Sequence, residues 1–181
     1  MKIKSEDLLK LHIPRWEEFP AFELYIDQVI AFINESMVIF QNGEEPLITA
    51  SMINNYVKNG VIDPPVKKKY NRNHLAKLVV ICMGKRMLSI ADLNESIAAM
   101  SRIFEVSEGY NTLCNEVEYE ILSAAKPYEY PAKRVVDAES KEIAVMRALA
   151  SAVARLLLFD RIIGQRRRLS NIASRMLENK K

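Results

Sequence analysis

The chain has 181 residues, with 26 Lys and Arg, 23 Asp and Glu, and a formal net charge of +3. Hydrophobic residues make up 49% of it, which excludes an intrinsically disordered chain. Two cysteines and two histidines are too few for a disulfide scaffold, an all-cysteine zinc site or most histidine-based metal sites, so we expect no metal.

The first predicted helix starts near Phe22, after two prolines. Its apolar residues recur at intervals of three and four, as on one face of a helix, and it should end near Gln41. A short second helix is predicted from Ala50 to Asn59. Thr49 is its expected N-cap, and Gly60 stands where a left-handed residue ends a helix.

Pro64 and Pro65 exclude a helix just beyond this point. Residues 66–70 are therefore predicted to form a short extended or hairpin-like segment. Asn71 is the next plausible N-cap, and its helix should end near Leu88.

The rest of the chain is predicted to be helical as well. Ser89 opens one helix, with an acidic residue three positions later that approximates a capping box, and residues 107–125 form another. A long helix is expected from Asp137 to at least Ile163, with Gly164 as a possible kink and helical character again over residues 165–177. Because this helix is apolar on most sides, it should be buried by several neighbours in a helical bundle, within the chain or across a dimer.

Charge is distributed in blocks along the chain. Residues 1–54 hold four basic and nine acidic residues, whereas residues 55–86 hold eight basic residues and one acidic residue. Residues 87–141 are again acidic, with five against ten, and residues 142–181 are basic, with nine against three. A compact basic segment between acidic neighbours suggests a polyanionic partner, although a solvated surface without a partner is the alternative.

The most informative stretch combines the short second helix with the basic turn that follows it. The spacing predicts an inward face formed by Ile53, Tyr56 and Val57. The polar face and the basic turn together give the candidate DNA-binding residues, which are Ser51, Asn54, Asn55, Lys58, Lys67, Lys68, Lys69, Tyr70 and Arg72. Asparagine can contact adenine edges and lysine can contact phosphate, and a short helix of this kind fits the major groove.

This stretch resembles the DNA-binding domain of the MerR-like winged-helix family. The resemblance covers about residues 47–97. In that family a recognition helix contains a tyrosine and is followed by a glycine, an aliphatic pair, a proline and a basic wing. The residues that match the helix pattern are Asn54, Asn55, Tyr56, Gly60, Val61 and Ile62. Those that match the wing are Pro64, Lys68, Lys69, Tyr70 and Arg72. The whole chain also resembles a family of bacterial proteins catalogued only as a domain of unknown function, for which no activity is implied.

The MerR-like resemblance implies an all-α protein in which a winged helix-turn-helix precedes a helical bundle with a long C-terminal helix. Residues 1–105 would hold the N-terminal helix and the winged domain, and residues 106–181 a dimerisation or effector region. The implied function is that of a DNA-binding transcriptional regulator. Its partners would be double-stranded DNA, a second copy bound through the C-terminal helices, and an unknown effector.

An interaction module that kept the winged-helix shape without DNA binding is the main alternative. Asn54 stands where MerR-like proteins usually carry an arginine, which favours this alternative. We expect no enzyme activity, no catalytic residues and no cofactor, because the sequence has no nucleophile–base pattern, metal-ligand spacing or phosphate-binding loop. The N-terminus has no signal peptide and no run of apolar residues is long enough to cross a membrane, so we expect a cytoplasmic protein.

Three further residues have simple expected roles. His74 lies on the first turn after the wing and is expected to be a surface or N-terminal-turn histidine rather than a ligand or a catalytic residue. Cys82 is expected to be a small core residue, and so is Cys114, with a redox or effector role left open for the latter.

Overall fold

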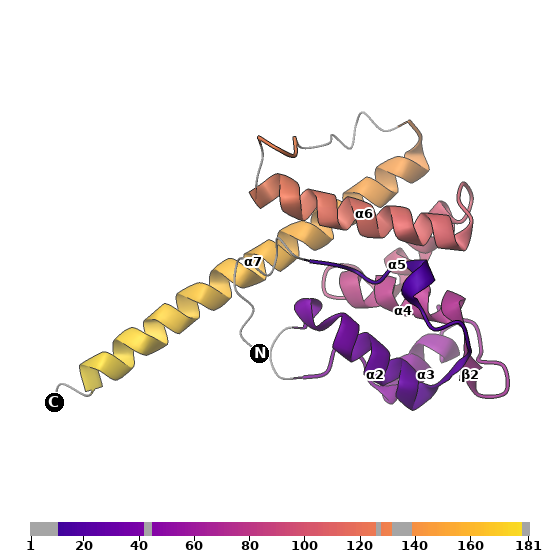
Figure 1. The fold of residues 1–181 in the computed structure, drawn as a ribbon, viewed down its shortest axis with the longest axis horizontal. Coiled ribbons are helices and arrows are strands. Elements are labelled where there is room, and N and C mark those ends of the chain that lie inside the picture. The colour runs from indigo at the N-terminus through magenta and orange to yellow at the C-terminus, as the bar shows by residue number, and fades with distance from the viewer. Residues whose placement is uncertain (1–10, 42–44, 126–127, 132–138, 179–181) are drawn as a thin grey trace.

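The computed structural model describes residues 11–41, 45–125, 128–131 and 139–178. It is mostly helical, as the sequence predicts, and Figure 1 shows the order of its elements. In chain order these are η1 (Trp16–Glu18), β1 (Leu24–Tyr25), α2 (Ile26–Ser36), η2 (Val38–Phe40), α3 (Ala50–Lys58), β2 (Lys69–Tyr70), α4 (Arg72–Gly84), α5 (Ile90–Met100), α6 (Val106–Ala125) and α7 (Lys141–Glu178).

Three predicted helix N-caps are confirmed. The side-chain oxygens of Thr49, Asn71 and Ser89 accept hydrogen bonds from the backbone N–H groups at the starts of α3, α4 and α5, at 3.3, 3.3 and 3.1 Å. Gly60 has the predicted left-handed backbone, with φ of 69°. These caps satisfy N–H groups that the first turn of a helix leaves without a partner, and so they fix where each helix begins.

Other helix ends differ from the prediction. The first helix, α2, ends at Ser36 rather than near Gln41, and the short 3-10 helix η2 continues the chain. Helix α4 ends at Gly84 rather than near Leu88. A Cβ atom at Gly84 would lie only 2.5 Å from the side chain of Leu93 in α5. Helix α7 continues through Gly164 without a break, and its predicted start at Asp137 lies outside the described residues.

Helix α4 lies at the centre of the molecule. Ten of its 13 residues are buried, and it contacts α2, α5, α6, α7 and β2. Helices α6 and α7 form the most extensive helix pair, and the buried α7 residues in this region run from Met146 to Leu157. Figure 1 shows that the C-terminal part of α7 extends beyond the other helices. Among the described residues, no helix is both long and apolar enough to cross a bilayer.

The N-terminal arm is fastened to α6. The backbone N–H of Ile13 donates to Glu118 Oε1 at 2.6 Å, and Arg15 forms an ion pair with the same carboxylate. The backbone N–H of Trp16 donates to Asn111 Oδ1 at 2.9 Å. One hydrophobic core includes buried residues from this arm and from every helix between α2 and α7. It therefore crosses the predicted boundary between residues 105 and 106, and the division into two parts stays a prediction.

Candidate nucleic-acid interface

The loop before α3 is held from two sides. The Asn34 side chain of α2 both donates to the backbone carbonyl of Ile48, at 3.0 Å, and accepts from its N–H, at 3.1 Å. Nζ of Lys85, the residue that follows α4, donates to the carbonyl of Leu47. Because Thr49 then caps the helix, the position at which α3 starts is fixed relative to both α2 and α4.

Helix α3 buries one face and exposes the other, as predicted. Ile53 and Tyr56 are 0% and 6% exposed. Its exposed residues include the predicted set of Ser51, Asn54, Asn55 and Lys58. The side chain of Asn59 donates to Asn55 Oδ1 at 3.0 Å, which orients the Asn55 amide along the helix surface. The structure thus gives α3 a continuous polar surface that carries amides and one cation.

The chain after α3 forms a hairpin with a two-residue turn. The N–H of Val66 donates to the carbonyl of Lys69 at 3.2 Å, and the N–H of Lys69 donates to the carbonyl of Val66 at 2.9 Å. The two central residues, Lys67 and Lys68, have φ of 50° and 65°. Positive φ at both central positions is typical of a type I′ turn, which joins twisted antiparallel strands.

Lysine is an unusual choice for this turn. A left-handed backbone costs a non-glycine residue about 1–2 kcal/mol, and type I′ turns favour Asn-Gly instead. Lys67 and Lys68 are both exposed at this turn. Backbone strain of this kind is often retained at functional sites, where the side chain is needed for something other than stability.

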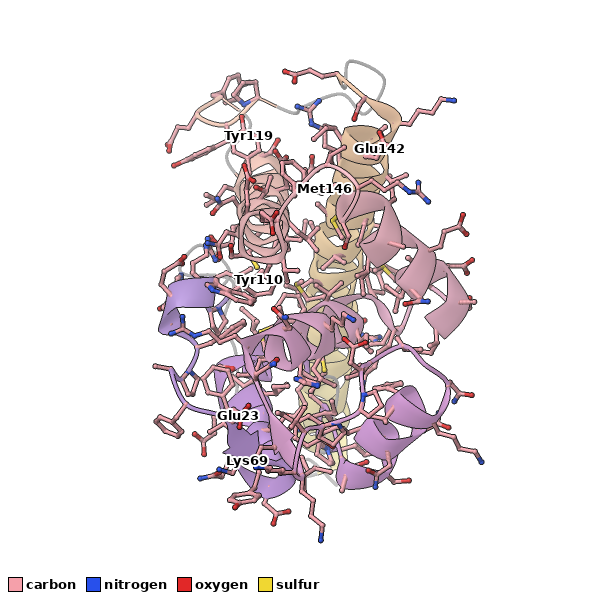
Figure 2. The ribbon with its side chains drawn as sticks, turned by 90° about the vertical axis from the view of Figure 1, so that its right-hand side faces the viewer. Glu23, Lys69, Tyr110, Tyr119, Glu142 and Met146 are labelled. Carbon is pink, nitrogen blue, oxygen red and sulfur yellow. The ribbon has the colours of Figure 1, made fainter. Side chains whose placement is uncertain are left out.

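A short ribbon supports the turn. Strand β1 pairs antiparallel with β2, so that Tyr25 lies opposite Lys69, and Val66 lies opposite Lys69 on the other side. Lys69 Nζ lies 5.6 Å from the centre of the Tyr25 ring, which is a cation–π distance. Figure 2 shows Lys69 at the end of the molecule opposite to Tyr119 and Glu142.

Two of the predicted site residues have other roles. Tyr70 is 3% exposed, and its ring meets that of His74 edge-on at 5.3 Å, so it belongs to the core and is not available to phosphate. The guanidinium of Arg72 donates to the carbonyls of Phe19, at 2.9 Å, and Pro20, at 3.3 Å. It fastens the arm before β1 to the start of α4.

Most of the other cations in the basic segment also have partners. Lys77 forms an ion pair with Asp63 at 2.8 Å, Arg86 forms one with Asp160, and Lys85 contacts Leu47 as described above. Within residues 55–86, all of which are described, Lys58, Lys67 and Lys68 are the exposed cations with no recorded partner. The positive surface is therefore smaller than the charge count suggests, and it is concentrated on the end of α3 and the turn.

His74 and the cysteines are buried. His74 lies in the N-terminal turn of α4, as one of the two expectations had it, but it is only 5% exposed and so is not a surface residue; burial lowers its pKa. Its Nδ1 lies 3.0 Å from the backbone nitrogen of Asn71, and its Nε2 has no partner among the described atoms. Burial raises the pKa of both Cys82 and Cys114 to about 12, so neither presents a reactive thiolate near neutral pH. Across the described residues, no group of three or more His, Cys, Asp or Glu could hold a metal ion.

Sequence reasoning missed the residues that position α3, namely Asn34 and Lys85. Both make their contacts through backbone groups of the loop, at separations of 14 and 38 residues. The one available signal was an asparagine beside the apolar residues Ile30, Ile33 and Met37 at helical spacing, where a buried polar side chain requires a partner.

Comparison with known proteins places part of this chain in a defined family. Residues 14–119 match a family described as a domain of unknown function (DUF1836). This match begins in the N-terminal arm and ends within α6, and so it includes α3, the hairpin and the central helix α4. No curated protein and no solved structure matches the chain.

Proposed function

The chain belongs to this family of unknown function, and we propose from the geometry of its surface that it is a DNA-binding transcriptional regulator. In this proposal α3 enters the major groove and the lysine turn contacts phosphates beside it. The proposal extends to a MerR-like winged helix-turn-helix, in which α2 and α3 form the helix-turn-helix and the hairpin before β2 is the wing.

The observation that carries the proposal is the pair of lysines at the hairpin turn. Lys67 and Lys68 are exposed, have no recorded partner and occupy left-handed backbone positions that favour other residues. A partner that benefits from two adjacent positive charges at a narrow tip explains why lysine is used there. DNA phosphates are such a partner, because each neutralised phosphate releases condensed counterions.

The exposed surface of α3 supports the second part of the proposal. Asn54 and Asn55 carry amides that can donate to and accept from adenine in the major groove, and Lys58 follows them on the next turn. Helix α3 has nine residues. An α-helix with its side chains is about 10–12 Å in diameter, so α3 fits across a major groove about 12 Å wide. Figure 1 shows α3 and the hairpin at the same end of the molecule, away from α6.

A salt series tests the phosphate contacts. We expect the full-length protein to bind random duplex DNA with a steep linear fall of log K against log salt. Because each phosphate contact contributes about 0.9 to that slope, the double variant Lys67→Ala, Lys68→Ala should flatten it by about 1.8. The matched control replaces Lys141 on α7 and Arg102 in the α5–α6 connection, which are both exposed cations, and should leave the slope unchanged.

Selection of bound sequences from a random duplex pool tests the base contacts. Asn54→Ala should relax the preference at one or two base positions, at about 1–3 kcal/mol for each lost bidentate contact, while the salt slope stays the same. If the wild-type protein binds no duplex at low salt, the proposal is wrong.

An interaction module without DNA binding is the second candidate. It is favoured by three exposed apolar side chains around the hairpin, because Phe22, Tyr25 and Val66 are 68%, 54% and 62% exposed. Two results together would support this candidate over the regulator. The wild-type protein would bind no DNA, and its binding to a protein partner would be weakened by Phe22→Ser and Val66→Ser.

A further inference from the structure

A small apolar cavity lies between α4, α5 and α6, away from the proposed DNA surface. Its volume is about 50 Å³, and apolar side chains from all three helices and the intervening turn line it: Val80, Ile97, Met100, Phe104 and Leu113. Tyr110, labelled in Figure 2, also faces it, and its hydroxyl is already committed to the carbonyl of Pro14. The cavity is open to solvent at one side.

The size and chemistry of the cavity limit what can enter. A closed apolar cavity of about 150 Å³ admits benzene, so this smaller space suits a short aliphatic group rather than a ring. Gly109 forms part of the wall, and a Cβ atom there would lie 3.1 Å from Cβ of Phe104. The α5–α6 connection is therefore already packed closely on one side of the cavity.

One cation stands among the lining residues. Lys77 is the only positively charged residue of the described lining, and the other polar side chains there besides the tyrosine are Ser101 and Glu105. Its Nζ lies 2.8 Å from Asp63 Oδ2, and this hydrogen bond lowers the pKa of the Asp63 carboxyl. The Asp63 side chain is 72% exposed, and exposed ion pairs contribute only about 0–1 kcal/mol, so another carboxylate can replace Asp63 at small cost.

We propose that this cavity binds a small aliphatic carboxylate, with its hydrocarbon chain among Val80, Ile97 and Leu113 and its carboxylate on Lys77. Free short-chain fatty acids and aliphatic amino acids share this chemistry. Glu105 distinguishes them, because it offers a partner for an α-ammonium group that only the amino acid carries.

Binding would also reach the DNA-facing hairpin. Asp63 directly precedes Pro64 and Pro65, which lead into the lysine turn, and Lys77 attaches Asp63 to α4. A ligand carboxylate that pairs with Lys77 breaks the ion pair with Asp63, so the base of the hairpin becomes more mobile. This regulatory step depends on the proposed function, whereas the binding of the ligand does not.

Nuclear magnetic resonance titration of the full-length chain tests the site directly. The probes are isovalerate, leucine, 3-methylbutanol and 3-methylbutylamine, with acetate as the anion that lacks a hydrocarbon chain. We expect isovalerate, leucine or both to shift the amide signals of α4, α5 and the start of α6, with a dissociation constant on the order of 1 mM. The alcohol should bind at least tenfold more weakly, and the amine and acetate should leave these signals unchanged.

Two substitutions have opposite expected effects. Lys77→Met keeps the length of the side chain and removes its charge, and it should weaken carboxylate binding at least tenfold. Asp63→Asn removes the competing carboxylate and should strengthen binding several-fold. Arg102→Gln, an exposed cation on the α5–α6 connection outside this cavity, is the matched control and should change nothing. Unchanged or weaker binding in Asp63→Asn, or equal binding of the alcohol, would overturn the proposal.

A DNA titration with and without saturating ligand separates this inference from the proposed function. A ligand-dependent change in DNA affinity that disappears in Lys77→Met supports the coupling. If the protein binds the carboxylate but binds no DNA, the proposed function is wrong and the proposed ligand site stands. DNA binding without any carboxylate binding removes the site and leaves the function.

Discussion

At the scale of single residues, we expect Lys67 and Lys68 to lower the stability of the fold and to raise its affinity for DNA. Both occupy left-handed positions of a type I′ turn, where Asn-Gly is favoured. The double variant Lys67→Asn, Lys68→Gly should therefore raise the free energy of unfolding by about 1–2 kcal/mol, because it removes the strain. The same variant should bind DNA more weakly, and the slope of log K against log salt should flatten by about 1.8, because both charges are gone. Urea denaturation and a DNA salt series measure the two effects.

The control for this pair separates backbone strain from charge. Lys67→Ala, Lys68→Ala removes the charges and keeps residues with a Cβ atom in the same positions, so it should lose DNA affinity without the gain in stability. If the Asn-Gly variant is less stable than the wild-type protein, the turn is not strained as described.

His74 should make the folded protein sensitive to acid. Burial lowers its pKa in the folded state, so the histidine stays neutral there at a pH at which the unfolded chain already takes up the proton. Its contribution to stability is present above the unfolded-state pKa of about 6.5 and is lost as the pH falls below that value. Urea denaturation at pH 7.5 and pH 5 should show this loss in the wild-type protein.

A substitution at the same position isolates this effect. Gln is a favourable residue at the third position of a helix whose N-cap is Asn, so His74→Gln keeps the cap and removes the titration. It should show a smaller loss of stability on acidification than the wild-type protein. Equal losses in the wild-type protein and in His74→Gln would exclude His74 as the source.

Local chemistry explains which residue-level predictions are confirmed. The roles of Thr49, Asn71, Ser89 and Gly60 depend on a few neighbouring residues, so the sequence contains all the information they need. The burial of Tyr70 could not be predicted in this way. A strand of two residues has no periodicity that would show which side chain faces the core.

At the scale of elements, the Asn34 side chain determines how α3 meets α2. Its two hydrogen bonds satisfy both backbone groups of Ile48, which is 0% exposed. Asn34→Ala would leave a buried donor and a buried acceptor without partners, at a cost of about 1–3 kcal/mol for each that finds no substitute. We expect a loss of stability in this range in thermal or urea unfolding, together with weaker DNA binding.

Asn94→Ala provides the control, because Asn94 is an exposed asparagine on α5. Its stability should stay within about 0.5 kcal/mol of the wild-type value. If Asn34→Ala is as stable as this control, α3 does not depend on the contact. The sequence predicted α2 and α3 but not this link, since helical periodicity reports which face is buried and not which polar side chain crosses to a loop.

The basic segment illustrates the same limit for charge. Its eight cations suggested a broad positive surface, yet Lys77, Arg86 and Lys85 have partners at separations of 14, 74 and 38 residues. Such pairs form only after the helices have packed, so a charge count along the chain overestimates the exposed charge.

At the scale of the whole molecule, we expect the two parts of α7 to have different roles, one in the stability of the fold and the other in contacts between copies. The helix has 38 residues and spans about 57 Å, and Figure 1 shows that its C-terminal part extends beyond the other helices. Deletion of residues 161–181 should therefore change the unfolding midpoint little. If α7 also joins two copies, as the MerR-like resemblance implies, the same deletion should convert a dimer into a monomer.

Light scattering coupled to size-exclusion chromatography measures the mass of both proteins, and circular dichroism measures their unfolding. A truncated chain that stays dimeric would exclude the C-terminal part of α7 as the dimer contact. The mostly helical class and the long last helix were predictable because long periodic segments carry a strong signal. The central position of α4 was not, because a helix buried on nearly all sides has weak amphipathic character.

The docking of the N-terminal arm on α6 has a consequence for synthesis of the chain. Ile13, Arg15 and Trp16 find their partners 105, 103 and 95 residues later. A ribosome that has made the chain only as far as α5 therefore carries a nascent chain whose arm has nothing to dock on. Ile13, which is 0% exposed in the finished fold, stays accessible to chaperones until α6 emerges, so translation must pass Glu118 before this arm can reach its native place.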